Sequence, residues 1–417
     1  MTAEVVCRAA GQDAPAALGR LCSLPADRFA HEVWSCQPWL SRAADLPGRV
    51  EDVFSAGAVD ELLSVRGLRT PFLRLAKDGR IVPPARYTGS GGSGATVPDQ
   101  VRDDAVLRLF ADGSTVVLQG LHRTWTPVGA LAAELAADLG HPVQVNAYVT
   151  PPQSQGFAAH YDTHDVFVLQ VDGTKRWVLH APVLPDALPD EPWEQRAAEV
   201  EARADEPPLL DVVLEPGDCL YLPRGFLHSA TALGGTSIHL TFGVHPTSER
   251  DLARALLEAV VAEVGRASLP VGWDPIGPDG LAALDEARKR VADRLNGLDL
   301  TKVAAVLHDT RSARQRPEPL SPLAQATAAA AVDGSTRVRL RRHLGERVEP
   351  DNSGGCVLVL ADRRLPVRAD DTPALNLLLT GEACRVADLP GPDPLSVVVS
   401  LLREGVLVVH PDRPAHP

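Results

Sequence analysis

Three side chains that can hold a metal ion stand at two places in the sequence. His160 and Asp162 lie two residues apart in AAHYDTHDVFVLQV, and alternate residues of a strand share one face. His228 follows LEPGDCLYLPRG, where a short strand ends in a Pro-x-Gly turn. Two imidazoles and one carboxylate form the facial triad of non-haem iron(II) enzymes, which leaves coordination positions open on one side. We therefore predict that His160, Asp162 and His228 are metal ligands and catalytic residues.

Each part of this triad has an ordinary explanation when it stands alone. A His-x-Asp pair also occurs where an aspartate caps a turn beside a surface histidine, and His228 by itself suits a loop histidine. The order and spacing of the three residues together favour the metal site. The same region holds other histidines, and His239 in SIHLT could face the same interior. These others are His164, His180, His239 and His245.

Lys175 is predicted to bind a cosubstrate. The residues Asp172-Gly173-Thr174 predict a turn, and we expect a hairpin whose second strand begins at Lys175. An ammonium group there can bind the distal carboxylate of 2-oxoglutarate while the keto-acid end of that molecule chelates iron. The alternative is a solvated lysine after a tight turn. Asn146, Tyr148 and Thr241 can offer an amide, a phenol and a hydroxyl to the same interior.

The surrounding sequence predicts a mainly β core followed by helices. VGALAAELAADLG (128–140) predicts a helix that ends at a glycine. From there to about residue 245, β-branched and aromatic runs broken by Gly, Pro and Asp are typical of a sandwich or jelly roll. Helical periodicity returns after Pro246, and a proline-rich stretch at 315–323 is a plausible linker. The last ninety or so residues predict a small α+β domain with a final helix and strand.

Composition narrows the class of protein. A chain of 417 residues is long for one domain and suggests two or three. No apolar run is long enough for a membrane span or a secretory segment, and the six cysteines form no CxxC pair, so we expect a cytoplasmic protein with reduced thiols. The net charge of −13 argues against wholesale binding to phosphate backbones. A basic partner suits this sign, although acidity also keeps proteins soluble.

These motifs carry a resemblance to a known family. NAYVTPPQSQGFAAHYDTHDVFVLQVDGTKRWVLH together with LEPGDCLYLPRGFLHSA resembles the JmjC-type cupin family, and within it the ribosomal oxygenases, which hydroxylate side chains of ribosomal proteins. FAHEVWSCQPWL and VRGLRTPFLRLAKDGR upstream, and LLLTGEACRVADLPG with LLREGVLVV downstream, are similar to the same family. The terminal motifs are much less specific than the iron motif. Gly243 departs from the pattern, because some relatives have a small hydroxyl residue there.

The resemblance implies a fold and a domain order. It implies a mainly β catalytic core, a double-stranded β-helix or cupin jelly roll, with an α-helical dimerisation region and a C-terminal winged-helix-like α+β domain. The expected boundaries are an N-terminal α/β extension at 1–100, the JmjC core at 101–246, the helical dimerisation region at 247–314 and the winged-helix-like domain at 324–417. An apolar stripe in the helical region agrees with a homodimer.

The resemblance also implies the reaction. It assigns Fe(II) to His160, Asp162 and His228, and the 2-oxoglutarate carboxylate to Lys175, with O2 as the second cosubstrate. Asn146, Tyr148 and Thr241 map near the cosubstrate more loosely. The expected substrate is a side chain of a protein, most simply a basic ribosomal protein.

Three other functions stay open from the sequence. The same chemistry serves lysine demethylation or hydroxylation of a small molecule, and fold analogy does not choose among substrates. A cupin scaffold without catalysis, which binds a partner, is the third. A winged helix suggests DNA, but its expected recognition region has few basic residues, and TRVRLRRHLGER (336–347) is the one dense basic stretch. Direct DNA binding is therefore not favoured.

Overall fold

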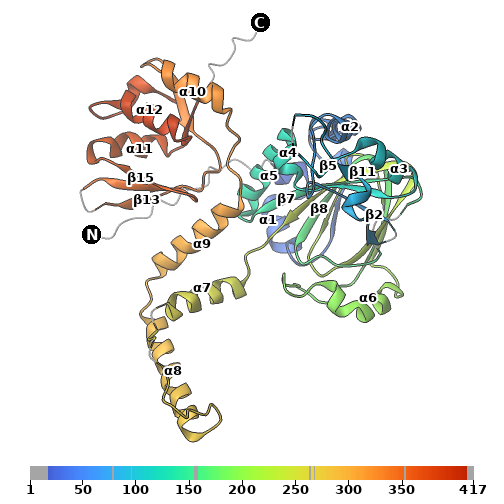
Figure 1. The fold of residues 1–417 in the computed structure, drawn as a ribbon, viewed down its shortest axis with the longest axis horizontal. Helices are drawn as coiled ribbons and strands as arrows, with labels where there is room; N and C mark the ends of the chain where they lie inside the picture. The colour runs from blue at the N-terminus through green and yellow to red at the C-terminus, as the bar shows by residue number, and fades with distance from the viewer. Residues whose placement is uncertain are drawn as a thin grey trace. The chain divides into compact units, whose positions relative to one another are not determined.

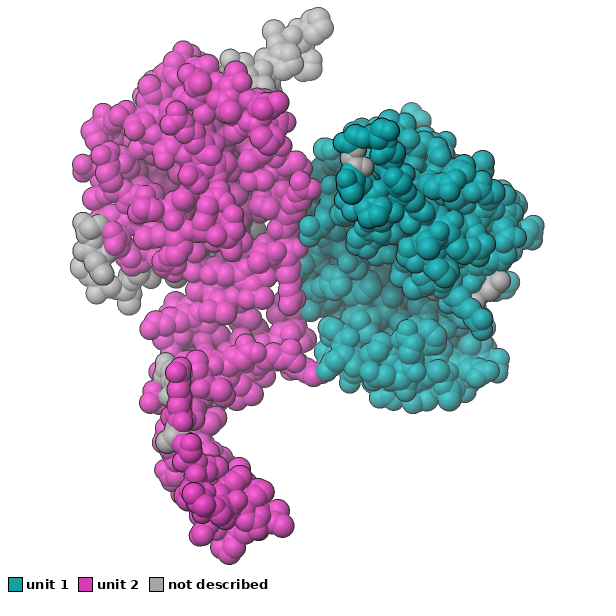
Figure 2. Space-filling view, in the orientation of Figure 1, with its two compact units in different colours: residues 1–246 teal, residues 247–417 magenta. Residues whose placement is uncertain are grey.

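The computed structural model describes residues 17–77, 79–94, 96–154, 158–262, 264–266, 268–351 and 354–410. The chain divides into two compact units, residues 1–246 and residues 247–417 (Figure 1, Figure 2). The predicted site residues all lie in the first unit. Each unit has its own hydrophobic core, so each is described by itself.

Unit 1 is built on one large antiparallel sheet, which has nine strands within the described residues. Its strands are β1 (Trp39–Ser41), β2 (Leu73–Lys77), β3 (Arg80–Ile81), β6 (Thr115–Leu118), β7 (Val143–Thr150), β8 (Asp165–His180), β9 (Leu210–Leu214), β10 (Cys219–Leu222) and β11 (Leu227–Val244). They are ordered β1-β10-β8-β11-β7-β6-β2-β3, and β9 pairs with β8. The prediction of a mainly β core is confirmed. The sheet also takes β1, β2 and β3 from the first 100 residues.

The two faces of the sheet have different partners. On β7, Val145, Ala147 and Val149 are buried in a core that also holds side chains from the helices of unit 1. The alternate residues Asn146, Tyr148 and Thr150 therefore point to the opposite face. The helices are α1 (Ala26–Arg28), α2 (Ala56–Ser64), α3 (Asp103–Ala111), α4 (Leu121–Thr124), α5 (Thr126–Leu139) and α6 (Ala197–Ala204). The helix predicted at 128–140 is confirmed as α5, which ends at Gly140 in the left-handed conformation.

The hairpin predicted at residues 172–174 is wrong. β8 continues through these residues as one strand and pairs with β11 on both sides of them, with a register shift between Leu233 and Ile238. Gly173 has a φ of 60°, and a Cβ there would lie 2.1 Å from the carbonyl oxygen of Thr236. The glycine thus permits an irregularity between two long strands and does not reverse the chain.

Unit 2 begins with three helices and ends in a small α+β domain. The helices are α7 (Glu249–Val261), α8 (Pro278–Asn296) and α9 (Leu300–Arg314). The α+β domain contains α10 (Pro322–Ala331), α11 (Thr372–Leu378), α12 (Pro394–Arg403), β12 (Arg337–Leu340), β13 (Arg347–Pro350), β14 (Cys356–Val359), β15 (Arg364–Val367), β16 (Cys384–Arg385) and β17 (Leu407–Val409). The predicted final helix and strand are confirmed as α12 and β17.

Two expectations from composition can be compared with the described residues. None of the helices there is both long enough and apolar enough to cross a membrane. The cysteines of the described part, at positions 22, 36, 219, 356 and 384, are free thiols. Cys7 lies outside the described residues.

Candidate metal centre

Backbone pairing brings the two predicted histidine ligands together. His160 and His228 form an isolated antiparallel bridge, in which each amide donates to the other residue's carbonyl oxygen, at 3.1 Å and 2.9 Å. Their ring centroids lie 4.5 Å apart. The Gly225 amide donates to the Asp162 carbonyl oxygen at 2.9 Å, so the segment that carries the carboxylate is tied to the turn before His228. Segments distant in the sequence therefore meet through main-chain hydrogen bonds.

The three side chains converge on one point. Their candidate ligand atoms all lie within 4.8 Å of one another, and His228 Nε2 is 3.8 Å from Asp162 Oδ2. The Nδ1 atom of His160 lies 2.8 Å from the Ala158 carbonyl oxygen, and that of His228 lies 3.1 Å from the Phe226 carbonyl oxygen. A carbonyl oxygen only accepts, so both Nδ1 atoms carry the proton and both Nε2 atoms keep a lone pair for a metal.

The protonation states also suit metal binding. Burial first, and then the neighbouring His160, lower the pKa of His228 to about 4, which leaves its ring neutral at neutral pH. Burial raises the pKa of Asp162, but His164, His228, His160 and Arg74 outweigh this effect and the net shift is downward. A carboxylate between two imidazole Nε2 atoms is a donor set for a divalent transition metal, and three protein ligands leave room for further ligands.

A buried aspartate holds the turn that precedes His228. Asp165 is fully buried, accepts a hydrogen bond from the Tyr221 hydroxyl at 2.8 Å and one from the Arg224 amide at 3.0 Å, and lies 3.4 Å from the Arg224 guanidinium. Gly225 has a φ of 85°, and a Cβ there would lie 2.0 Å from the Leu184 carbonyl oxygen. The Pro-x-Gly sequence is thus required by close backbone approach. These contacts fix where β11 begins and where His228 lies.

Lys175 is a buried cation on β8. Its side chain is 3% exposed, and its ammonium donates a hydrogen bond to the Thr150 hydroxyl at 3.0 Å. Burial lowers the pKa of Lys175 to about 7. No salt bridge joins Lys175 to a carboxylate of the described residues, so a charged Lys175 lacks a counter-ion there. Because a buried charge is costly unless it is paired, this site suits an anionic group supplied by a ligand.

The other predicted cosubstrate residues line the same face of β7 and β11. Asn146 pairs with Thr241, and Tyr148 pairs with His239, across these antiparallel strands. The Asn146 side-chain oxygen accepts from the Gly120 amide at 3.1 Å, and the Tyr148 hydroxyl is hydrogen-bonded to the Thr241 side chain. Burial first raises the pKa of Tyr148, which keeps the phenol protonated. The structure therefore places these residues beside one another.

Aromatic rings connect this face with the metal ligands. The His239 ring stacks on Tyr148 with centroids 5.0 Å apart, and Trp177 meets His239 edge-on at 5.4 Å. Trp177 also lies 5.9 Å from the His228 ring. Burial, and then the charge of Lys175, lower the pKa of His239 well below its usual value, so His239 is neutral. The possibility that His239 faces the same interior is confirmed, but it does not belong to the ligand cluster.

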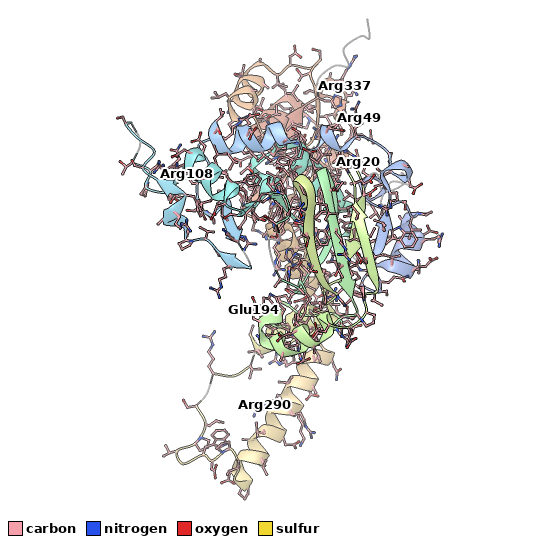
Figure 3. The ribbon with its side chains drawn as sticks, turned by 90° about the vertical axis from the view of Figure 1, so that its right-hand side faces the viewer. Arg20, Arg49, Arg108, Glu194, Arg290 and Arg337 are labelled. Carbon is pink, nitrogen blue, oxygen red and sulfur yellow. The ribbon has the colours of Figure 1, made fainter. Side chains whose placement is uncertain are left out.

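The outer rim of the centre includes one further aromatic side chain. Trp193 lies in the 3-10 helix η6 (Trp193–Arg196), next to Glu194, which is labelled in Figure 3. Its ring centroid is 6.5 Å from that of His160. This segment lies between β8 and α6 in the chain.

Two residues of the interior were missed from the sequence. Arg74 on β2 is hydrogen-bonded to the Tyr148 side chain and contributes to the low pKa of Asp162. Thr150 holds the Lys175 ammonium. The period of two that predicts Asn146 and Tyr148 extends to Thr150, so that residue could have been found. Arg74 alternates with buried Leu73 and Leu75, which is a weaker signal for an inward-facing polar side chain.

Gly243 has a structural explanation. A Cβ at this position would lie 2.7 Å from Cδ2 and 2.8 Å from Nε2 of His164, whose ring stacks on His245 at 5.0 Å. The space that a hydroxyl side chain would need is thus filled by His164 in this chain. The packing of His164 against Gly243 thus explains why this chain has glycine at this position.

We expect Gly243→Ala to destabilise unit 1 by about 1 to 3 kcal/mol, because His164 must move to admit the methyl group. Thermal and denaturant unfolding measure this change. Gly235→Ala on the same strand is the matched control, since a Cβ there meets nothing within 4 Å. Equal stability of the two variants would contradict the close packing of His164 against Gly243.

Comparison with known proteins agrees with this geometry. A family model described as JmjC domain matches residues 127–252, a range that contains every predicted ligand and cosubstrate residue. Residues 127–252 are thus similar to a JmjC domain, and relatives that match this part of the chain are named ribosomal oxygenases. It is 33% identical over 242 residues to ribosomal oxygenase 1 of Bos taurus, which covers 57% of this chain and 34% of that protein. The Gallus gallus protein of the same name is 32% identical over 284 residues, or 65% of this chain and 45% of that one.

A relative whose name differs from that of the first two also matches this chain. The bifunctional lysine-specific demethylase and histidyl-hydroxylase NO66 of Culex quinquefasciatus is 31% identical over 233 residues, which is 54% of this chain and 33% of the relative. The matched part of these three relatives is thus less than half of their own length. The activities, substrates and partners of these relatives therefore support a proposal for this chain and are not assigned to it.

Solved structures extend the fold comparison beyond the JmjC domain. The crystal structure of Escherichia coli ribosomal oxygenase YcfD matches with a TM-score of 0.54 and 17% identity, over 93% of this chain and 98% of that one. A structure of YcfD in complex with cobalt and 2-oxoglutarate matches with a TM-score of 0.52 and 15% identity, over 94% and 99% of the two chains. At this level of identity the comparison shows the fold, a JmjC cupin-like core with a large antiparallel sheet.

Proposed function

We propose that this JmjC protein is an Fe(II)- and 2-oxoglutarate-dependent oxygenase that hydroxylates a side chain of a ribosomal protein. The observation that carries the proposal is the convergence of two Nε2 atoms and one carboxylate beside a buried lysine that lacks a counter-ion in the described residues. The names of the relatives, and the cobalt and 2-oxoglutarate in YcfD, agree with this chemistry. The ligand set fits ferrous iron, which prefers this facial arrangement.

In this proposal each group of the chain has a separate task. His160, Asp162 and His228 would hold the iron, while Lys175, with Thr150 beside it, would bind the distal carboxylate of 2-oxoglutarate. Asn146, Tyr148 and Thr241 would contact the cosubstrate or the substrate, as polar groups of the same strand face. The roles of the other five residues, Lys175, Thr150, Asn146, Tyr148 and Thr241, are proposed from their positions on the sheet.

The overall reaction balances without an added reductant. 2-Oxoglutarate, O2 and a C–H group of the substrate give succinate, CO2 and the hydroxylated substrate. Bound iron with its cosubstrate supplies the oxidising chemistry, and the protein supplies position and exclusion of water. Burial of His228, Lys175 and Trp177 agrees with that second role, because each lies in the dry interior of the sheet.

The test uses iron-loaded protein with 2-oxoglutarate, O2 and ribosomal proteins from cells that lack the gene. We expect succinate release and a mass gain of one oxygen atom on one ribosomal protein, found by intact-mass measurement and peptide mapping. His160→Ala protein is the inactive control. Formaldehyde release from methylated lysine peptides, without a stable oxygen gain, would instead indicate the demethylase activity in the name of the Culex relative. Binding of a partner without succinate release would indicate a non-catalytic cupin.

The domain organisation remains part of the proposal. We assign residues 1–100 to an N-terminal extension, 101–246 to the JmjC core, 247–314 to a dimerisation region and 324–417 to a winged-helix-like domain. We also propose a cytoplasmic location. The free thiols of the described residues agree with it, and none of the described helices could span a membrane.

The helices α7, α8 and α9 support a homodimer. Within the described residues each of these helices buries only one residue, Val260, Gly280 and Val303 respectively. Exposed apolar side chains are spread along all three, and they include Leu252, Leu257, Val261, Leu281, Leu284, Leu300 and Val306. Helices that do not bury their apolar side chains within one chain are stabilised by a second copy.

We expect Leu252→Asp with Leu257→Asp to convert a dimer into a monomer, because each new charge would be buried between the copies. Light scattering with size-exclusion chromatography measures the mass. Arg290→Ala, on the exposed face of α8 and labelled in Figure 3, is the control that should stay dimeric. A monomeric parent protein would contradict the assignment of residues 247–314.

The C-terminal domain does not favour DNA binding. Its arginines are largely engaged in ion pairs: Arg339 pairs with Glu318 at 2.7 Å, and Arg347 pairs with Asp309 at 2.8 Å. The Arg339 hydrogen bonds lower the pKa of Glu318 to about 2, so this pair persists through the physiological range. Arginines that neutralise acidic side chains of the same unit contribute less to a phosphate-binding surface.

A further inference from the structure

A basic groove lies at the β3 edge of the large sheet, outside the metal centre. It has a volume of about 410 Å³, and the side chains that matter for its charge are Lys77, Arg80, Arg86, Asp112 and Ser114. These residues come from β2, from β3, from the 3-10 helix η5 (Pro84–Arg86) and from the segment between α3 and β6. This surface is called the β3 groove below.

The charge of the β3 groove is opposite to that of the whole chain. Among the described residues of the groove, three cations stand with one carboxylate, while the chain carries a net charge of −13. Lys77 forms a salt bridge with Asp112, with Nζ 2.9 Å from Oδ2, and its hydrogen bond is the main cause of the low pKa of Asp112. Arg80 and Arg86 are exposed, and within the part of the chain that the structure describes neither forms a salt bridge, although the charge of Arg86 also contributes to the low pKa of Asp112. The Arg80 guanidinium and, in part, that of Arg86 therefore remain for an anion.

A buried hydroxyl adds a neutral donor to the same groove. Ser114 is 0% exposed, lines the groove, and its hydroxyl finds no hydrogen-bond partner among the described residues. Buried polar groups in folded proteins are nearly always hydrogen-bonded, so a partner from outside the chain is expected here. The hydroxyl is independent of the arginines, because it comes from a different element and carries no charge.

The groove lies beside the chain segment that leads to His160. A Cβ at Gly79, in the β2–β3 turn, would lie 3.8 Å from the Ala158 amide nitrogen. A Cβ at Gly113 would lie 3.6 Å from the Ser154 hydroxyl and 3.9 Å from Cε of Lys77. Gly79 and Gly113, which neighbour groove residues in the chain, thus lie close to Ala158 and Ser154, on the segment that leads to His160.

We propose that the β3 groove binds a phosphate group. Guanidinium groups bind the oxygens of phosphate with paired, charge-assisted hydrogen bonds, and a hydroxyl adds a neutral donor to the tetrahedral anion. Two sources share this chemistry, the backbone of RNA and free phosphate. A ribosomal protein substrate lies next to RNA in its natural setting, which connects the site to the proposed function without depending on it.

The test measures binding to the full chain and not turnover. Fluorescence anisotropy follows a labelled single-stranded RNA oligonucleotide over a series of salt concentrations, and phosphorus NMR line broadening follows inorganic phosphate. We expect Arg80→Ala and Arg86→Ala each to weaken binding about tenfold and to reduce the salt slope for RNA by about one. Ser114→Ala should weaken binding about fivefold, as expected for the loss of one neutral hydrogen bond.

Arg49→Ala is the matched control, because it also removes one exposed positive charge from unit 1. Arg49 precedes the 3-10 helix η4 (Val50–Asp52) and pairs with Glu51 at 3.6 Å. Figure 3 labels both Arg49 and Arg108, which lies on α3. Tighter binding of RNA than of phosphate, lost in the groove variants, identifies RNA as the source; binding of phosphate alone identifies the free ion. Absence of both, or equal losses in Arg49→Ala, would overturn the proposal, and neither result bears on succinate release.

Discussion

Replacing His160 with alanine is expected to lower the affinity for a divalent metal by at least about 100-fold and to reduce succinate formation to background. The reason is geometric. Three ligand atoms lie within 4.8 Å of one another, and each Nδ1 is already committed to a carbonyl oxygen, so among the described residues no further imidazole nitrogen stands in the cluster to replace the missing one. Calorimetric titration with Co²⁺ or Mn²⁺ measures the affinity.

The same experiment separates ligand loss from misfolding. The bridge between His160 and His228 is made by main-chain atoms, so the alanine variant keeps it and should unfold at nearly the temperature of the metal-free parent. His164→Ala is the control, because His164 lies close enough to affect Asp162 but is not one of the clustered ligands. If His164→Ala lost metal affinity as completely as His160→Ala, the assigned ligand set would be wrong.

The clustering of His160, Asp162 and His228 could be predicted from sequence because its signal is local. His-x-Asp on one strand face and a histidine after a Pro-x-Gly turn are patterns of a few residues each, and strand alternation converts them into directions. The turn motif is informative for a further reason that only the structure shows. Gly225 must pass close to the Leu184 carbonyl oxygen, so the glycine and the position of His228 are linked.

Arg74 could not be predicted in the same way, because its role depends on strand order. It reaches Tyr148 across β6, which lies between β2 and β7 in the sheet, and no local pattern reports that order. The hairpin error has a related cause. A Gly after Asp suggests a reversal of the chain, but here the long pairing of β8 with β11 on both sides of Gly173 outweighs the local turn preference.

The helices after residue 246 show a third limit. Periodicity predicts α7, α8 and α9, but it cannot say which chain covers their apolar side chains. The structure of one chain leaves Leu252, Leu257 and Leu284 exposed. The apolar stripe in the sequence therefore does not say what covers it, and mass measurement tests the proposed homodimer.

Replacing Lys175 with methionine is expected to weaken 2-oxoglutarate binding by about 100-fold, because the distal carboxylate would lose a charge-assisted hydrogen bond in a buried site. The metal affinity should stay near that of the parent, since Lys175 is outside the ligand cluster. Titration of 2-oxoglutarate into metal-loaded protein under anaerobic conditions measures the first quantity. Comparable loss of metal binding would mean that Lys175 supports the fold of the centre and not the cosubstrate.

The pH dependence of the parent protein gives a second readout for Lys175. Its pKa without ligand is about 7, so above that pH most of the lysine is neutral and must take up a proton to bind a carboxylate. We expect the affinity for 2-oxoglutarate to be flat below about pH 7 and to fall about tenfold per pH unit above it. Calorimetry in buffers of different ionisation enthalpy should detect this proton uptake directly. Lys175→Arg, whose guanidinium stays charged, should show a flatter profile.

Stability should change in the opposite direction from binding. The folded pKa of Lys175, about 7, lies below its usual value of 10.5, so between these pH values the unfolded chain binds the proton and the folded chain does not. The free energy of unfolding of the ligand-free protein therefore rises with pH across this window, as far as this group contributes. Lys175→Met removes the buried ammonium, so it should be more stable than the parent at neutral pH and lose that pH dependence. A variant that is more stable yet binds 2-oxoglutarate more weakly would show that the buried lysine is kept for its ligand. A less stable variant would show that Lys175 stabilises the fold through its hydrogen bond to Thr150.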